Sequence, residues 1–261
     1  METSTPDQPL ARVDYDRVQH AAYAKARALS SAALGRYMET FARHLPPERP
    51  LTGIDLGSGT VRFTPALAEA FCGPVYGVEP AAAMRRTAEA EASHPQVRYL
   101  AGEAAAIPLP DASADFVLMF LSFHHVKDRA AAGSEIARVL KPGGRLILRS
   151  TFRERIPDHW WRGFFPRSHE IEEAMFPSTA EARAVFETAG FETLEVALPV
   201  IPFEEDIAEA VAKLKLRAVS TFEHMTEQEL DEGFARLDAA LAAGTIARKP
   251  TTGDFVVFRG R

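Results

Sequence analysis

A glycine-rich loop followed by a well-spaced acid is the strongest chemical signal in the sequence. The stretch GIDLGSGT, residues 53–60, is a short apolar run that breaks into a loop before a helical segment. Gly57 and Gly59 allow positive φ and close approach, so backbone N–H groups there can face a ligand. Glu79 ends the next apolar run, where a carboxylate can accept hydrogen bonds from both hydroxyls of a ribose. The alternative is that Glu79 only begins a helix, where its charge suits the helix dipole.

Three classes of ligand compete for this loop. A phosphate loop of the NTPase kind needs Gly-Lys-Ser/Thr at its end, and this loop has no lysine. A dinucleotide loop needs a third glycine at the position of Arg62, which weakens that interpretation without excluding it. An adenosine cofactor without phosphates needs fewer amide donors, and Glu79 would repel a phosphorylated ribose. The loop and Glu79 together therefore favour a cofactor with an unphosphorylated ribose.

Strands and helices that alternate at short spacing must position this loop. The run at residues 115–120 is continuously apolar, as expected for a strand covered on both faces. The alternation predicts right-handed crossovers and a parallel sheet whose ligands bind beyond the carboxyl ends of the strands. Val61 cannot easily take positive φ, so we expect it in the first turn of the helix after the loop. The expected strands are 52–56, 75–79, 97–101, 115–120, 145–149, 191–198 and 254–259, and the expected helices are 13–45, 60–71, 80–92, 134–140, 178–190 and 204–243.

Capping patterns mark two helices in the second half of the chain. Ser178 with Glu181, and Thr226 with Glu229, fit the capping box. The second of these pairs implies a break near His224 in the last helical stretch. That stretch lies between the last two expected strands and is interpreted as an insertion or lid, whereas residues 151–176 are expected to be irregular.

Composition bounds the class of protein. The chain has 261 residues, 46% hydrophobic and 25% charged, which suits one large α/β domain or two small ones. The net charge of −6 argues weakly against nucleic acid as the main partner. Cys72 is the only cysteine, which excludes an internal disulfide and a cysteine-based metal site. No apolar run approaches membrane-spanning length and residues 1–10 do not resemble a signal peptide, so we expect a cytoplasmic protein.

Five blocks, in order, carry a family resemblance. The blocks GIDLGSGT, VYGVEP, GEAAAIPLPDASADFVLMF, SFHHV and EIARVLKPGGRLIL resemble the signature blocks of class I S-adenosylmethionine-dependent methyltransferases, most of all the small-molecule (methyltransferase type 11-like) subgroup. The resemblance implies an α/β fold, namely a Rossmann-like three-layer sandwich with a seven-stranded, mostly parallel sheet, an antiparallel last strand and a helical lid. A single domain would comprise an N-terminal helical lid (1–50), a cofactor-binding core (51–150) and a remainder (151–261) that holds the last two strands, the aromatic loop and the helical insertion.

The resemblance also implies S-adenosylmethionine as cofactor and S-adenosylhomocysteine as product. In the family the glycine loop wraps the methionine part, the acid at Asp55 orients the loop, and the acid at Glu79 takes the ribose. Glu103 stands where an acid often accepts from the adenine amino group. Met84 and Leu121, which the resemblance places against the adenine and the methionine amine, could instead be core residues. The implied cofactor-binding positions are Asp55, Gly57, Ser58, Gly59, Glu79, Pro80, Met84, Glu103, Ala104, Leu121 and, on the N-terminal helix, Tyr23.

The residues expected near the acceptor each have two interpretations. His124 or His125 could deprotonate an acceptor, because imidazole titrates near neutrality, or both could hydrogen-bond the backbone. Arg149 could clamp an acidic substrate or pair with an acid in the lid. The segment DHWWRGFFP could wall a flat substrate or pack the lid onto the core. The substrate candidates are Tyr15, Arg149, Trp160, Trp161 and Phe164; Tyr15 and Tyr23 could equally fasten their helix.

The leading hypothesis is methyl transfer to a small-molecule acceptor at an oxygen, nitrogen or carbon atom. Such an in-line displacement needs positioning and a dry site, and no metal. The alternatives are a non-methylating enzyme of the same fold that uses the bound cofactor for cyclisation or decarboxylation, and a regulatory protein that only binds the cofactor. An oxidoreductase is disfavoured by Arg62. We expect no nucleic-acid or membrane partner, and a monomer or homodimer.

Overall fold

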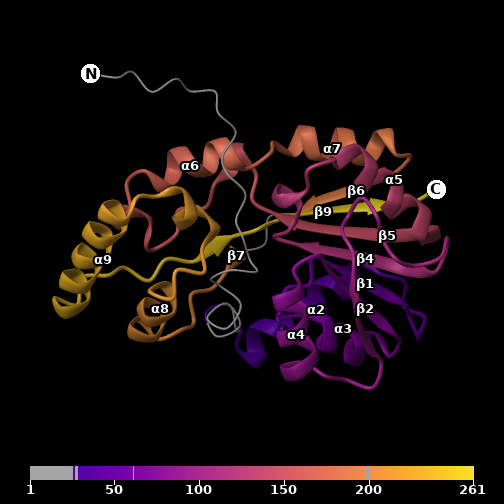
Figure 1. Cartoon of the computed structure of the whole chain (residues 1–261), viewed down its shortest axis with the longest axis horizontal. Coiled ribbons are helices and arrows are strands. Elements are labelled where there is room, and N and C mark those ends of the chain that lie inside the picture. Colours follow the sequence, from indigo (N-terminus) through magenta and orange to yellow (C-terminus); the bar gives the residue numbers. More distant parts are fainter. Residues whose placement is uncertain (1–25, 27–28, 61, 198–199) are drawn as a thin grey trace.

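The computed structural model describes residues 26, 29–60, 62–197 and 200–261, so Tyr15, Tyr23 and Val61 lie outside the described residues. Within these ranges seven strands form one sheet, which confirms the expected strand set (Figure 1). The largest difference is in the fifth strand, which begins at Leu140 because it includes the KPGG segment. The strands of this sheet are β1 (Gly53–Leu56), β2 (Val75–Glu79), β3 (Val97–Ala101), β4 (Ala114–Phe120), β5 (Leu140–Ser150), β6 (Glu192–Ala197) and β9 (Asp254–Arg259).

The strand order is β3-β2-β1-β4-β5-β9-β6. Strands β1 to β5 pair in parallel, and β9 runs antiparallel to both of its neighbours, which confirms the expected antiparallel last strand. The order reverses between β1 and β4, because the chain first extends the sheet towards β3 and then returns to add β4 on the other side. Parallel sheets bind ligands beyond the carboxyl ends of their strands at such a reversal. The glycine loop leaves β1 at this point.

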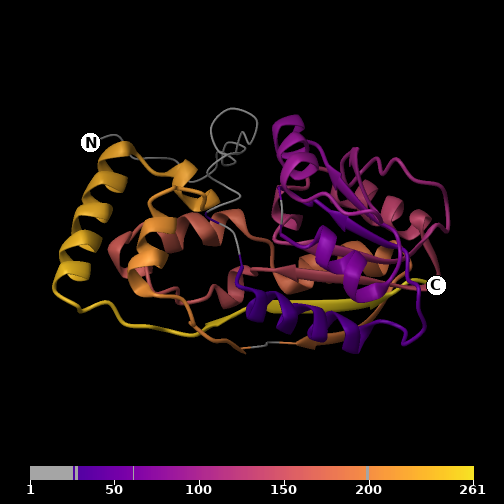
Figure 2. The ribbon, with the colours of Figure 1, turned by 90° about the horizontal axis from the view of Figure 1, so that it is seen from below.

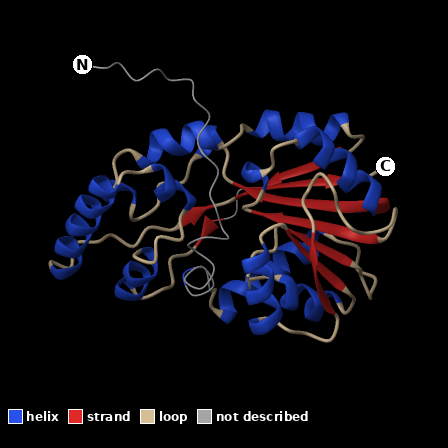
Figure 3. Cartoon of the chain, viewed as in Figure 1, coloured by secondary structure: helices blue, strands red, loops and turns tan. Residues whose placement is uncertain are grey.

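Helices cover both faces of the sheet (Figure 3). Phe116 and Leu118 of β4 pack in the cluster that contains the apolar residues of α2 and α3, whereas Val117 and Met119 pack in the cluster with those of α5 and α7. Side chains of a strand alternate between faces, so a strand buried on both faces is apolar throughout. The helices are α2 (Ser31–His44), α3 (Thr64–Phe71), α4 (Ala82–Glu91), α5 (Arg129–Val139), α6 (Ser168–Met175), α7 (Thr179–Thr188), α8 (Ile207–Leu214) and α9 (Glu227–Ala242).

Two expected helix starts are wrong, and the residues at each start explain why. The expected start at residue 13 lies outside the described residues, within which α2 begins after Ser30, whose hydroxyl accepts from the Ala33 N–H at 3.1 Å. Helix α3 begins at Thr64, with a proline in its first turn, rather than at residue 60. Helix α5 begins after Asp128, whose carboxylate caps it, rather than at residue 134. The loop after β1 is therefore longer than expected.

The second half of the chain adds a group of helices beyond the carboxyl edge of the sheet, on the left of Figures 1 and 2. These helices bury an aromatic cluster of their own around Trp161, Phe165 and Phe222. We call residues 157–176 and 203–250 the lid. A two-stranded sheet of β7 (Val200–Ile201) and β8 (Thr251–Thr252) lies at its base.

Both expected capping boxes are present, at the starts of α7 and α9. The expected break near His224 is a 3₁₀ turn at Ser220–His224 between α8 and α9. Helix α6 lies in a stretch that was expected to be irregular, so that expectation is wrong. In the described part of the chain, no helix combines the length and apolar character that crossing a membrane requires.

Candidate active site at the carboxyl edge of the sheet

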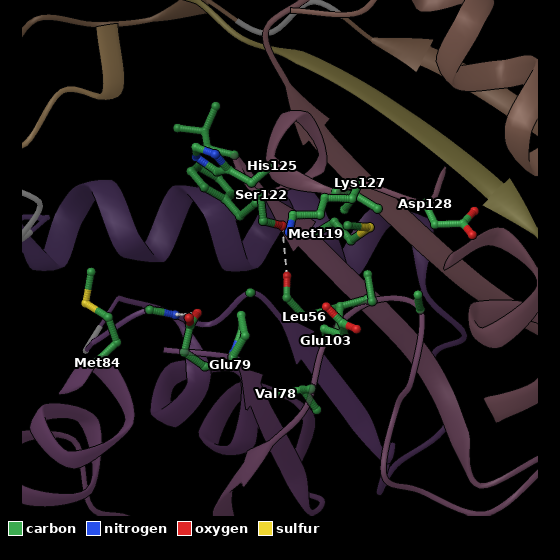
Figure 4. A pocket seen from close by; sticks show the side chains of 18 residues that line it. Leu56, Val78, Glu79, Met84, Glu103, Met119, Ser122, His125, Lys127 and Asp128 are labelled. Carbon is green, nitrogen blue, oxygen red and sulfur yellow. Dashed lines mark hydrogen bonds between the residues drawn. The ribbon is translucent and has the colours of Figure 1, made fainter. Parts of the chain in front are cut away.

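A cavity of about 370 Å³ lies beyond the carboxyl ends of β1, β2 and β4 (Figure 4). It lies where the strand order reverses, which is the position that the sequence predicts for a ligand. Its size falls in the range of small-molecule sites in proteins. Most of the predicted cofactor positions and one predicted catalytic position line it: Gly57, Gly59, Glu79, Pro80, Met84, Glu103, Ala104, Leu121 and His125.

Glu79 joins the second strand to the glycine loop. Its Oε2 atom accepts a hydrogen bond from the Gly59 N–H at 3.0 Å, and its Oε1 atom accepts one from the Ala81 N–H at 3.0 Å. The side chain is 8% exposed and lines the cavity. Arg85 donates to the carbonyl oxygens of Glu79 and Pro80 and so holds the turn after β2. Glu79 therefore contacts both the start of a helix and the cavity, and its two interpretations are compatible.

Asp55 and Ser58 do not line the cavity, although both belong to the loop segment. The Asp55 carboxylate is buried and accepts a 2.7 Å hydrogen bond from the Thr64 hydroxyl. Burial raises the pKa of Asp55 to about 6, while the Thr64 hydrogen bond and the Arg62 charge act in the opposite direction. Asp55 thus connects the end of β1 to the first residue of α3 and so holds the two ends of the loop together.

The turn after β4 forms another wall of the cavity. Leu121 has φ of +55°, a conformation that is strained for a residue other than glycine. Its N–H donates to the Arg149 carbonyl at 2.8 Å, which fixes this conformation at the end of the sheet. The Ser122 hydroxyl donates to the Leu56 carbonyl at 2.9 Å, a contact drawn in Figure 4. The turn therefore spans from β5 to β1 through backbone and side-chain contacts.

The two adjacent histidines differ in their access to the cavity. They lie in a 3₁₀ turn, Phe123–His125, with ring centroids 3.9 Å apart. His125 lines the cavity. His124 does not, and its ring lies edge-on to Phe176 with centroids 4.8 Å apart. The geometry therefore brings one of the two predicted catalytic histidines to the site and packs the other.

Arg149 lies behind the cavity wall. Its guanidinium carbon is 5.4 Å from the ring centroid of Phe120, and the guanidinium carbon of Arg62 is 5.6 Å from the same centroid. Phe120 lines the cavity, whereas neither arginine does. Arg149 is buried, and its guanidinium donates to the Ser150 carbonyl at 3.3 Å. Arg149 therefore does not line this cavity, and its contact with a substrate stays a prediction.

The predicted aromatic wall lies in the lid. Trp161 is buried in the aromatic cluster, and Trp160 and Phe164 pack partly buried against that cluster. Trp160 and Trp161 also line a second cavity of about 150 Å³ beside α8. The structure therefore supports the interpretation that these rings pack within the lid, because none of them lines the larger cavity. The predicted acceptor contact Tyr15 and cofactor contact Tyr23 lie outside the described residues.

About half of the cavity lining is not predicted from the sequence. Four of these residues lie at the carboxyl end of a strand or one residue before it, and the rest follow the carboxyl ends of β3 and β4. Proximity to a strand end was the available signal, because parallel strands converge on one edge. The missed residues are Leu56, Val78, Ala105, Met119, Phe120, Ser122, Val126, Lys127 and Asp128.

Comparison with known proteins supports this geometry. Residues 54–148 match the model of the methyltransferase-domain family. A demethylmenaquinone methyltransferase from Lysinibacillus sphaericus (strain C3-41) is 27% identical over 172 residues, which cover 58% of this chain and 74% of that protein. The chain therefore carries an S-adenosylmethionine-dependent methyltransferase domain.

Solved structures share the fold of this methyltransferase. A crystal structure from Anabaena variabilis ATCC 29413, inferred to be a methyltransferase of an antibiotic biosynthesis pathway, has a TM-score of 0.72 at 22% identity and covers 87% of this chain and 97% of that chain. A phosphoethanolamine-type N-methyltransferase from Haemonchus contortus, solved with phosphomonomethylethanolamine and S-adenosylhomocysteine, has a TM-score of 0.56 at 17% identity and covers 87% of this chain and 52% of that chain.

S-adenosylmethionine is the cofactor of this family, and the residues of the cavity fit it. Carboxylates at Glu79 and Glu103 can accept hydrogen bonds from hydroxyl and amino groups, and Met84 offers an apolar surface to a flat ring. Gly57 has φ of +76° and leaves its backbone open to close approach.

Proposed function

We propose that this methyltransferase transfers a methyl group from S-adenosylmethionine to a small-molecule acceptor, at an oxygen, nitrogen or carbon atom. The observation that carries the proposal is the cavity at the strand-order reversal, in which Glu79 both lines the wall and binds the Gly59 amide. The name of the Lysinibacillus relative, a demethylmenaquinone methyltransferase, adds support for a small acceptor. The acidic net charge of −6 supports a partner other than nucleic acid, and the single cysteine suits a cytoplasmic protein.

Each wall of the cavity has a role in this proposal. Glu79 accepts hydrogen bonds from the ribose hydroxyls, and Glu103 accepts one from the adenine amino group. The loop of Gly57 and Gly59 surrounds the amino-acid part of the cofactor, and Met84 packs against the adenine. The cofactor supplies an activated methyl group on its sulfonium, so the protein has to bind, orient and exclude water.

His125 is the proposed general base where the acceptor must lose a proton. It is the member of the histidine pair that lines the cavity, and it follows the strand end beside the proposed methyl group. The lid lies beyond the same edge of the sheet and would shelter the acceptor (Figure 2). Acceptors that need no deprotonation would react without His125.

Calorimetry and a product assay test the proposal. The purified protein is expected to bind S-adenosylhomocysteine, and to form it from S-adenosylmethionine only when an acceptor is added. A panel of quinols, phenols, amines and carboxylic acids would sort acceptors by class. Tight binding without turnover on any acceptor would favour the regulatory alternative, and a dissociation constant beyond the millimolar range would contradict the proposed cofactor site.

A further inference from the structure

Ser122 connects two strands where their backbone pairing has ended. The parallel register between β1 and β4 ends at Asp55 and Leu118, one residue before Leu56. The Ser122 hydroxyl donates to the Leu56 carbonyl at 2.9 Å and so continues the connection by one side-chain contact (Figure 4). Leu56 is the last residue of β1, and the next residue is the first glycine of the loop. The serine therefore acts on the backbone from which the loop departs.

The same serine also packs against the loop. Gly57 has φ of +76°, and a Cβ atom added there would lie 2.5 Å from the Ser122 Cβ and 3.0 Å from its Oγ. Real Cβ contacts are never this short, so the loop and the serine fit together only because position 57 has no side chain. Gly57 is held on its other side by its N–H, which donates to the Val78 carbonyl at 2.8 Å. The loop thus passes between β2 and Ser122 with little freedom.

The position of Ser122 is itself rigid. It follows Leu121, whose left-handed conformation is held by the hydrogen bond to the Arg149 carbonyl. Its own carbonyl accepts from the His125 N–H at 3.0 Å, which closes the 3₁₀ turn. A side chain anchored on both sides in this way can position a neighbouring loop without losing much conformational entropy.

We propose that Ser122 is a positioning residue for the cofactor, acting through Leu56 and Gly57 on the part of the glycine loop that surrounds the amino-acid half of the ligand. This inference rests on the proposed function and assigns the two halves of the cofactor to different segments of the chain. Glu79, Met84 and Glu103 belong to other segments and would bind the adenosine half. Loss of the Ser122 hydroxyl therefore affects an adenosyl amino acid more than a ligand that has only the adenosine and the sulfur.

The experiment compares two ligands on the full-length protein by calorimetry. S-adenosylhomocysteine carries the amino-acid half, and 5′-methylthioadenosine lacks it. Ser122→Ala is expected to raise the dissociation constant for S-adenosylhomocysteine about fivefold, as for loss of one neutral hydrogen bond, and to leave that for 5′-methylthioadenosine within about twofold. Ser113→Ala is the matched control, because it removes a hydroxyl that donates to the Pro110 carbonyl at 2.7 Å outside the cavity.

A second set of variants tests the packing part. Gly57→Ala is expected to weaken S-adenosylhomocysteine binding strongly, through the clash and the strained φ. Adding Ser122→Gly removes the clashing Cβ and is expected to recover at least about threefold of the lost affinity. Adding Ser122→Ala keeps the Cβ and should recover none. Melting temperatures of all variants establish that the compared proteins are folded.

The outcomes separate this inference from the proposed function. Failure of the wild-type protein to bind either ligand overturns the proposed function and this inference with it. If the wild-type protein binds S-adenosylhomocysteine and Ser122→Ala binds it equally well, or weakens both ligands alike, the role of Ser122 is overturned and the proposed function stands. Recovery by Ser122→Ala in the Gly57→Ala background, as good as that by Ser122→Gly, overturns the packing argument.

Discussion

The cavity and the lid use side chains in opposite ways. The cavity is built from strand ends, so glycine amides, two carboxylates and a few aliphatic side chains meet there, and the backbone decides where each lies. The lid is built from aromatic side chains that pack on one another, as Phe165 does against Phe222 and Phe234 at centroid distances of 4.7 and 5.1 Å. Residues in the first region can be placed from the chain trace, whereas residues in the second are placed only by their mutual packing.

A buried polar network marks the lid as a structure with its own interior. Glu172 is 4% exposed and accepts hydrogen bonds from Arg162 at 2.5 Å and from the Thr221 hydroxyl at 2.9 Å. Arg162 also donates to the Pro157 carbonyl. Removing one partner of such a buried pair leaves an uncompensated charge, so the network fixes how the loop, α6 and the 3₁₀ turn fit together. The aromatic segment therefore stabilises the lid through Arg162, which binds Glu172 of α6.

The largest expected effect is a loss of lid stability in Phe165→Ala, without a change in the cofactor cavity. Phe165 is 1% exposed, and its ring lies where a Cβ on Gly233 would be 2.3 Å away. Phe165→Ala should lower the free energy of unfolding of the lid by about 4 kcal/mol, because it leaves a cavity in the aromatic cluster. Urea unfolding followed by tryptophan fluorescence measures this loss, since both tryptophans of the chain, Trp160 and Trp161, lie in the lid.

Calorimetry with S-adenosylhomocysteine provides the contrast for Phe165→Ala. The affinity should stay within about threefold of the wild-type value below the lid transition, because Phe165 does not line the cofactor cavity. A loss of cofactor affinity as large as the loss of lid stability would show that the cavity and the lid are one cooperative unit rather than two independent regions.

Asp55 provides the next effect, which appears as a dependence on pH. Its pKa is raised to about 6 in the folded protein by burial, against about 4 in an unfolded chain. The folded state therefore binds the proton more tightly, and the stability from this group is present below about pH 4 and falls as the pH rises through 6. Over that interval the loss is about 3 kcal/mol at most.

Asp55→Asn isolates this contribution. The free energy of unfolding of the wild type, minus that of the variant, should decrease between pH 4 and pH 7 in urea titrations. The lid and surface acids change in the opposite sense, because hydrogen bonds and ion pairs lower the pKa of Glu181 and Glu229. They are present in both proteins, so they cancel in the difference. A difference that is flat or rises with pH would contradict the assignment to Asp55.

Glu79→Gln should weaken cofactor binding at the cavity and leave the lid unchanged. The amide can keep one acceptor oxygen but places an NH₂ group where Oε1 or Oε2 now accepts from a backbone N–H. We expect the dissociation constant for S-adenosylhomocysteine to rise about 30-fold, as for the loss of a hydrogen bond to a charged group. Glu89→Gln on the exposed face of α4 is the control and should bind as the wild type does. Equal binding by both variants would remove Glu79 from the cofactor site.

The sequence predicts the core well for a physical reason. Strands buried on both faces give continuous apolar runs, capping boxes announce helix starts, and the acid at Glu79 is placed by the end of its strand. The start of α3 escapes prediction because Phe63 offers no side-chain cap to mark it. Ser122 escapes because its role depends on the left-handed turn at Leu121, which no residue type there announces.

The lid resists prediction for a different reason. An aromatic-rich segment can line a substrate site or form a hydrophobic core within the lid. Only the packing partners of its rings distinguish the two arrangements. Trp161 packs against Phe165, in the same segment, and against Phe222, which lies in a 3₁₀ turn far along the chain. Sequence spacing does not reveal the contact with Phe222, so the sequence left both interpretations of Trp160, Trp161 and Phe164 open. Their packing in the lid comes from the structure, and their role toward a substrate stays a prediction.

The histidine pair offers the smallest and most local test of the comparison, since its two members divide between the cavity and the packing. His125→Ala should lower turnover with a protic acceptor at least about tenfold and leave S-adenosylhomocysteine affinity unchanged, because a general base acts on the acceptor and not on the cofactor. His124→Ala should change turnover less than about threefold and instead lower the melting temperature, since its ring packs against Phe176. Steady-state rates and thermal melts on the two variants separate these effects. If neither variant changes turnover more than tenfold, no histidine of the pair acts as a base, and the cavity serves by positioning alone.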